Sequence, residues 1–185
     1  RLHWWHFNEG AGTIAADSVG NINLNPIVVW TDGKIGSGME HTWLDGYEIN
    51  RNLAPEIGSK DLSIDFWWQN SVYPDEGRVS LSLQDSAGVK VFGLRPSINS
   101  GWYYFDGGEA IISQFIPPDN NWHHLALIYD SYNFYLYFYV DGVEKIKTPK
   151  VWFRRPITKL VIRGENWSYK LDDLAIWRGA LTASQ

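Results

Sequence analysis

The sequence contains no cysteine, which excludes disulfide bridges and thiolate metal sites. It also lacks any run of basic residues, and its formal net charge is −5. We therefore expect neither nucleic acid nor an anionic membrane surface as a partner. No stretch approaches the roughly 20 consecutive apolar residues of a membrane-spanning helix, which predicts no membrane insertion. The sequence also shows no amphipathic helical periodicity, so we expect a fold of the all-β class.

Aromatic residues, by contrast, are abundant: the 185 residues include 11 Trp, 10 Tyr and 8 Phe. A core of this size does not need so many indole rings, so we expect some of them at the surface. There, a planar apolar face with a polar tip is useful for binding.

The clearest structural signal lies between Trp122 and Thr148. From Phe134 to Val140, every second residue is phenylalanine, leucine or valine, and the residues between them are tyrosines. This alternation predicts a β-strand. A polar turn at Asp130–Asn133 joins this strand to the preceding apolar run and predicts an antiparallel hairpin. Asp141–Gly142 predicts a second tight turn into a third strand.

The rest of the chain also reads as short strands between turn residues, including a hairpin turn at Asp45–Gly46. The pattern predicts an all-β fold, a two-sheet antiparallel β-sandwich. The expected strands are Leu2–Phe7, Leu24–Trp30, Met39–Trp43, Tyr47–Asn50, Leu62–Gln69, Val79–Leu83, Val89–Leu94, Trp102–Phe105, Ala110–Phe115, Trp122–Tyr129, Phe134–Val140, Glu144–Thr148, Leu160–Arg163 and Tyr169–Trp177.

Five blocks of sequence, in order, resemble the laminin-G-like jelly-roll domains of the concanavalin A-like lectin/glucanase group. They are Phe7–Gly12 with Ala16–Asn21, Gly33–Gly36 with Leu44–Tyr47, Leu62–Trp67, Trp122–Ala126 with Tyr139–Gly142, and Leu171–Trp177 with Ala180–Leu181. The resemblance spans nearly the whole chain and implies a jelly roll. With the length, it implies one domain over residues 1–185, and the abrupt start at Arg1 suggests a domain excised from a larger protein.

The resemblance also implies a structural calcium ion, since members often hold one between the first loop and the last strand. It puts forward Asp17 and Asp172 as side-chain ligands, with carbonyls of the Gly-rich loops completing an oxygen shell. Glu9 is a weaker third candidate. Asp173 follows Asp172 directly in a predicted strand, so its side chain is expected on the opposite face, toward solvent. Alternatively, Asp17 makes an Asx-turn and Asp172 pairs with a lysine or arginine.

Two aromatic clusters have the residue mix that binds sugars, in which rings stack on C–H patches and polar groups reach hydroxyls. Alternation sends about half of each cluster's aromatics to the core, so for any single Trp packing remains the alternative. The candidate ligand-binding residues are Asn99, Trp102, Tyr104 and Asp106 in the first cluster, and Trp152, Arg154 and Trp167 in the second.

Several other aromatic and histidine positions have structural interpretations. Trp4, Phe66, Trp68 and Trp122 are predicted to pack in the core or between sheets. A stripe of Tyr135, Tyr137 and Tyr139 is a third candidate platform, unless another segment covers it. His123 and His124 point to opposite faces of one strand, so both cannot ligate one ion, and we expect framework roles for them.

Some members of the group are glucanases with an E-x-D-x-E carboxylate pattern, which this chain lacks. It also lacks the Gly-x-Ser-x-Gly and His-Glu-x-x-His motifs. We therefore predict a non-catalytic, monomeric carbohydrate-binding module of an extracellular, bacterial protein, an adhesin or a polysaccharide-degrading enzyme, with a glycan or polysaccharide as partner. The alternative is a structural or protein-interaction domain without a sugar ligand.

Overall fold

The structure, a computed structural model, describes residues 1–25, 29–41, 48–53, 61–70, 80–95, 100–105, 108–113, 119–149, 156–163 and 169–182. Within these ranges only the backbone is described for Glu48, Asn70, Ser80, 100–105 and 109–113. The described residues form strands and turns and no helix. Accordingly, no helix among them has the length and apolar character needed to cross a membrane.

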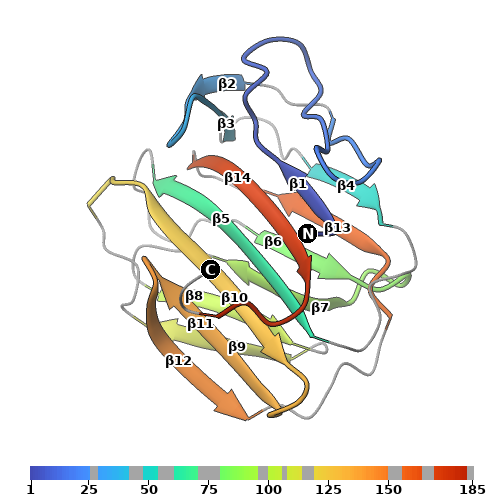
Figure 1. Cartoon of the computed structure of the whole chain (residues 1–185), viewed down its shortest axis with the longest axis vertical. Helices are drawn as coiled ribbons and strands as arrows, with labels where there is room; N and C mark the ends of the chain where they lie inside the picture. Colours follow the sequence, from blue (N-terminus) through green and yellow to red (C-terminus); the bar gives the residue numbers. More distant parts are fainter. Residues whose placement is uncertain are drawn as a thin grey trace.

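One layer is an eight-stranded antiparallel sheet in the order β12-β11-β10-β5-β14-β3-β2, with β1 paired to β14 (Figure 1). Figure 1 looks onto this sheet, with the second layer behind it. The strands are β1 (His3–Trp5), β2 (Val29–Asp32), β3 (Ser37–His41), β5 (Leu62–Asn70), β10 (His123–Asp130), β11 (Tyr135–Val140), β12 (Val143–Pro149) and β14 (Tyr169–Arg178).

The second layer is a six-stranded antiparallel sheet in the order β4-β13-β6-β7-β8-β9. Its strands are β4 (Glu48–Asn52), β6 (Ser80–Gln84), β7 (Lys90–Arg95), β8 (Ser100–Phe105), β9 (Gly108–Ser113) and β13 (Lys159–Arg163). The two antiparallel layers confirm the predicted β-sandwich, and they agree with a jelly roll.

The core lies between the layers because each strand turns alternate residues inward. Along β11, Leu136, Phe138 and Val140 are buried while the tyrosines between them are half-buried. Each large apolar side chain buried in this way contributes about 1.5–3 kcal/mol. The inner aromatic residues are Trp5, Phe7, Phe66, Trp68, Phe92, Tyr129, Phe138 and Tyr169.

The core prediction holds for Phe66 and Trp68 and is wrong for Trp4. Trp5 and Phe7 face the core, and Trp4 is half-buried on the outer face, where the Arg1 guanidinium lies 3.2 Å from its ring centroid. Residues 2–7 do alternate between the two faces, as predicted. Because Trp4 and Trp5 are adjacent and equally apolar, the sequence does not show which of the two faces the core. Trp122, also predicted to pack in the core, is half-buried and is not part of the core cluster.

The predicted pairing of the segments around residues 39 and 48 is also wrong. β3 belongs to the eight-stranded sheet and β4 to the six-stranded sheet, so they do not form a hairpin; Asp45–Gly46 lies outside the described residues. β3 pairs instead with β2, through a turn in which Gly33 N–H donates to the Gly36 carbonyl at 2.9 Å. Gly36 has φ +71°, a left-handed conformation that suits glycine and closes this turn.

Candidate functional site

The outer face of the six-stranded sheet, named here the six-stranded face, carries a row of small residues across its centre. The register aligns Asn50, Val161, Ser82, Gly93 and Tyr104 on neighbouring strands. Val161 and Ser82 are 3% and 0% exposed although they point away from the core cluster. A side chain at Gly93 would overlap the Leu81 carbonyl oxygen, so the closeness of β6 and β7 requires glycine there.

A second row on the six-stranded face carries positive charge beside an aromatic position. Arg163 is paired with Glu48 on β4 and Ser80 on β6, and Arg95 is paired with Trp102 on β8. Arg163 is exposed and Arg95 half-buried. Guanidinium groups next to an aromatic position and a floor of small residues provide the stacking and hydrogen-bonding chemistry that sugars use.

The register separates the aromatic positions of β8 into two sets. Tyr103 and Phe105 stand opposite Leu94 and Phe92, which are buried in the core. Trp102 and Tyr104, two of the predicted ligand-binding residues, hold the other parity and therefore occupy outer-face positions of the backbone. The other five predicted ligand-binding residues lie outside the described residues: Asn99, Asp106, Trp152, Arg154 and Trp167.

The outer face of the eight-stranded sheet is aromatic as well, but many of its polar groups bond to one another. Trp177 Nε1 donates to Asp65, whose other oxygen lies 3.2 Å from His124 Nε2. His6 Nδ1 lies 2.8 Å from an Asp173 oxygen, and the Lys34 ammonium lies 4.7 Å from the Trp67 ring centroid. Such mutually satisfied groups are typical of framework packing.

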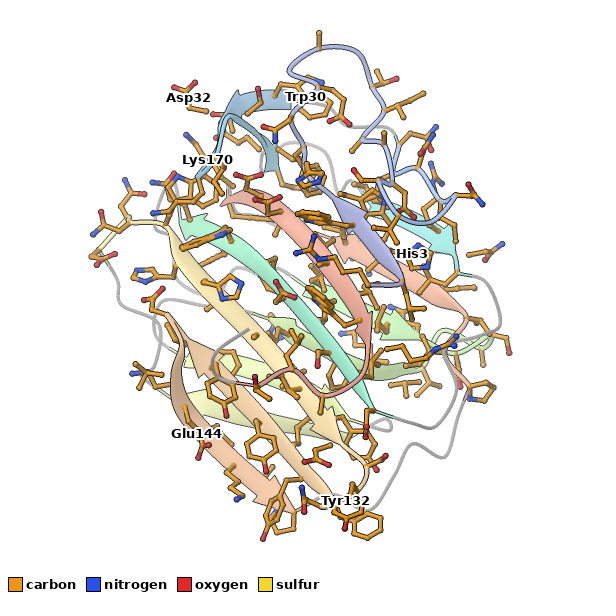
Figure 2. All side chains as sticks on the ribbon, viewed as in Figure 1. His3, Trp30, Asp32, Tyr132, Glu144 and Lys170 are labelled. Atoms are coloured by element: carbon orange, nitrogen blue, oxygen red, sulfur yellow. The ribbon has the colours of Figure 1, made fainter. Side chains whose placement is uncertain are left out.

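The tyrosine stripe belongs to this same face. The rings of Tyr135, Tyr137 and Tyr139 follow one another at centroid distances of 6.0 and 6.3 Å, and all three residues are half-buried. The Lys147 ammonium lies 4.4 Å from the Tyr135 ring centroid. Figure 2 shows Glu144 on β12, whose carboxylate accepts a hydrogen bond from the Tyr139 hydroxyl at 3.4 Å.

Asp17 is held as a hydrogen-bond acceptor within the first loop, where it forms an isolated bridge with Trp5. Its two oxygens accept from five donors: the His3 ring at 2.6 Å and the backbone N–H groups of Trp4, Val19, Gly20 and Ile22. Burial alone would raise the pKa of Asp17, but these hydrogen bonds outweigh it and lower the pKa below its ordinary value. The bond to Val19 confirms the alternative reading of Asp17 as an Asx-turn residue.

Asp172 lies elsewhere, fully buried under the turn between β2 and β3. Its oxygens accept from the N–H groups of Ile35 at 2.9 Å and Asp173 at 2.8 Å, and also from the N–H of Lys34. A Cβ on Gly33 would lie 2.7 Å from its Oδ2. Burial raises the pKa of Asp172 to about 6, and no lysine or arginine pairs with it among the described residues.

The two carboxylates therefore differ in their fit to calcium. Asp17 does not fit, because five donors occupy its oxygens and point positive dipoles at the place a cation would take. Asp172 fits better, because fewer N–H groups bond to its oxygens and no lysine or arginine among the described residues pairs with it. The Asn8 side-chain oxygen approaches the same turn and accepts from Ser37 N–H at 3.0 Å. Within the described residues, no three His, Asp or Glu side chains are grouped as a metal site.

Sequence reasoning missed Asn8, Asn50, Arg95 and the positions of Gly93 and Ser82. Asn8 belongs to the first block that resembles the lectin group, but its approach to the Gly33–Ser37 turn depends on tertiary structure. Arg95 and Gly93 carry no motif. Their alternation with buried Phe92 and Leu94 indicates an outward parity, and this signal was available in the sequence.

A family model for the concanavalin A-like lectin/glucanases superfamily, Laminin_G_3, matches residues 45–185. The chain belongs to this family. The match confirms the resemblance drawn from the sequence blocks. No curated protein sequence matches the chain.

Solved structures share the fold of this Laminin_G_3 chain at low identity. Domain 4 of AbnA, an extracellular arabinanase from Geobacillus stearothermophilus solved with arabinotriose, is 21% identical with a TM-score of 0.69, covering 100% of this chain and 95% of that one. The binding domain of botulinum neurotoxin serotype D is 13% identical with a TM-score of 0.77, covering 99% and 49%. Trypanosoma rangeli sialidase is 11% identical with a TM-score of 0.72, covering 98% and 31%.

The chain thus spans about half of the neurotoxin domain and about a third of the sialidase. At these identities the likeness shows the fold, which hosts many functions.

Proposed function

We propose that this Laminin_G_3 domain is a non-catalytic carbohydrate-binding module of an extracellular protein, and that it binds glycans on the six-stranded face. The observation that carries the proposal is the register of that sheet. It places Trp102, Tyr104, Arg95 and Asn50 at outer-face positions around the floor of Val161, Ser82 and Gly93.

The chemistry of these residues suits a sugar chain. Aromatic residues stack on the C–H patches of a sugar, while arginine and asparagine donate hydrogen bonds to its hydroxyls. The small residues of the floor are themselves buried, so the contacts with a sugar would come from the flanking positions Asn50, Arg95, Trp102 and Tyr104. The solved complex of the AbnA domain with arabinotriose makes arabino-oligosaccharides the first ligands to test.

The test is isothermal titration of the 185-residue chain with arabinotriose and with a panel of neutral and acidic oligosaccharides. We expect at least one to bind, and Trp102→Ala and Arg95→Ala each to weaken it about tenfold, since such residues dominate binding energy when they are contacts. Tyr132→Ala is the matched control. Tyr132 is 86% exposed at the turn between β10 and β11 in the other sheet (Figure 2), and its loss should leave affinity unchanged.

Absence of binding across the panel would contradict the proposal and favour the alternative, a structural or protein-interaction domain. Binding that survives both six-stranded-face variants would move the site to another surface.

We further propose a structural calcium ion at Asp172, with Asn8 and carbonyl oxygens of the Gly33–Ser37 turn as the other protein ligands. Calcium would supply the positive charge that the buried carboxylate lacks, and it prefers oxygen ligands from such loops.

A further inference from the structure

His123 is nearly buried, yet both of its ring nitrogens face carboxylates. Nδ1 lies 2.8 Å from an Asp141 oxygen and Nε2 lies 3.0 Å from an Asp119 oxygen. The side chain of His123 is 8% exposed, whereas those of Asp119 and Asp141 are 42% and 46% exposed. The imidazole therefore bridges two segments, the loop that enters β10 and the turn between β11 and β12.

This geometry suits the doubly protonated form of the ring. A neutral imidazole has one N–H donor and one bare nitrogen, so it can donate to only one of two carboxylates. Two donated hydrogen bonds require the doubly protonated cation, held between two anions. Of the described residues, Asp119 and Asp141 are the charged groups that face the ring. His124 points to the opposite face, toward Asp65. The neighbour of His123 on β5 is Trp68, which carries no charge.

We propose that Asp119, His123 and Asp141 form a proton-dependent latch that ties the loop before β10 to the β11–β12 turn and releases the loop when His123 loses its proton. The inference is independent of the proposed sugar site.

The contact between His123 and Asp119, on the loop before β10, is the one that would break. Asp141 keeps a second bond to β10, because its other oxygen accepts from His124 N–H at 2.9 Å. The other described hydrogen bonds of Asp119 are to the backbone N–H and the side chain of Asn121, within its own loop. After deprotonation the bare ring nitrogen would repel the Asp119 carboxylate. Of the described side-chain hydrogen bonds, the one from Gln69 Nε2 to the Asn120 carbonyl would still link the loop to β5.

The pKa shifts of His123 and Asp119 have the directions expected for a protonated ring held between two carboxylates. Burial lowers the pKa of His123, but the hydrogen bonds to Asp141 and Asp119 outweigh it and raise the pKa above 6.5. The hydrogen bond from His123 lowers the pKa of Asp119 to about 2. A raised histidine pKa stabilises the fold fully below pH 6.5, and this contribution is lost as the pH rises through the folded-state value.

The test is a pH titration of the 15N-labelled chain that follows the His123 ring by long-range ¹H–¹⁵N correlation. At pH 6.5 both ring nitrogens should be protonated, and the midpoint should lie above 6.5. Asp119→Asn removes the charge with little change of shape, so the midpoint should move down. Amide exchange at Asn120 and Asn121 should then accelerate at a lower pH than in the wild type.

The matched control is Asp32→Asn, which removes one exposed carboxylate without a described side-chain bond and should leave the midpoint unchanged. A neutral His123 ring at pH 6.5 would overturn the proposal. So would an unchanged midpoint in Asp119→Asn, because a merely structural hydrogen bond would lower stability equally at every pH.

Discussion

At the scale of single residues, carboxylates order this chain by accepting hydrogen bonds. Four of the five histidines lie within 2.6–3.2 Å of an aspartate: His3 with Asp17, His6 with Asp173, His123 with Asp119 and Asp141, and His124 with Asp65. Asp85 and Asp130 accept backbone N–H groups within their own turns. These bonds hold loops whose backbone groups would otherwise lack partners.

Asp17→Asn should destabilise the fold at neutral pH by on the order of 2–4 kcal/mol, because an amide cannot replace the carboxylate toward five donors. The depressed pKa of Asp17 adds a pH signature. Its stabilising contribution is present above pH 3.8 and is lost as the pH falls through the lower folded-state value. Urea unfolding between pH 2 and 7 measures both effects.

Asp32→Asn again serves as the control and should change stability by less than about 0.5 kcal/mol. An equal, pH-independent loss in both variants would show that the charge of Asp17 does not hold the first loop.

At the scale of elements, local alternation predicted nearly every strand. The expected Leu62–Gln69 became β5 (Leu62–Asn70), and Tyr169–Trp177 became β14 (Tyr169–Arg178). Both turns of the meander around β11 also hold, at residues 131–134 and at Asp141–Gly142. Period-two burial is a local property, so the sequence reveals it without knowledge of the fold.

The wrong predictions at this scale concern which strands pair and where a strand is irregular, and both depend on contacts between distant parts of the sequence. Asp45–Gly46 suggested a hairpin, but β3 and β4 enter different sheets. Asp173 was expected toward solvent by parity. It lies instead in a register shift between Asp172 and Ala175, with φ +47°, where it is half-buried and contacts His6. A bulge breaks the alternation on which parity depends.

The segment after β14 offers a prediction about one buried hydroxyl. Ser63 Oγ donates to the Gly179 carbonyl at 2.7 Å and accepts from Leu181 N–H at 3.1 Å, so it ties this segment to β5. Ser63→Ala should cost about 1–3 kcal/mol, since it leaves both groups without a partner. Amide exchange at Leu181 should accelerate more than exchange within β5; uniform acceleration across the chain would contradict a local tie.

At the scale of the whole molecule, the sandwich presents two outer faces of different character. On the eight-stranded sheet, tryptophan and histidine groups bond to aspartates of the same face. On the six-stranded face, a row of small residues is flanked by arginine, asparagine and aromatic positions. The shared outer-face position of Trp102 and Tyr104 on β8 could be predicted, because it follows from alternation within one strand. Their grouping with Asn50 could not, since it requires the order of five strands.

The proposed calcium site at Asp172 leads to a prediction about thermal stability. Melting of the wild-type chain should occur at a higher temperature in calcium than in EDTA, by about 3 °C or more, because a ligand that binds only the folded state stabilises it. Asp172→Ala should abolish this difference. Asp17→Asn should lower both melting temperatures and preserve the difference, since its oxygens are already occupied by N–H donors. A calcium effect that survives Asp172→Ala would refute the site under the β2–β3 turn, and one that disappears in Asp17→Asn would restore the shared site that the resemblance implied.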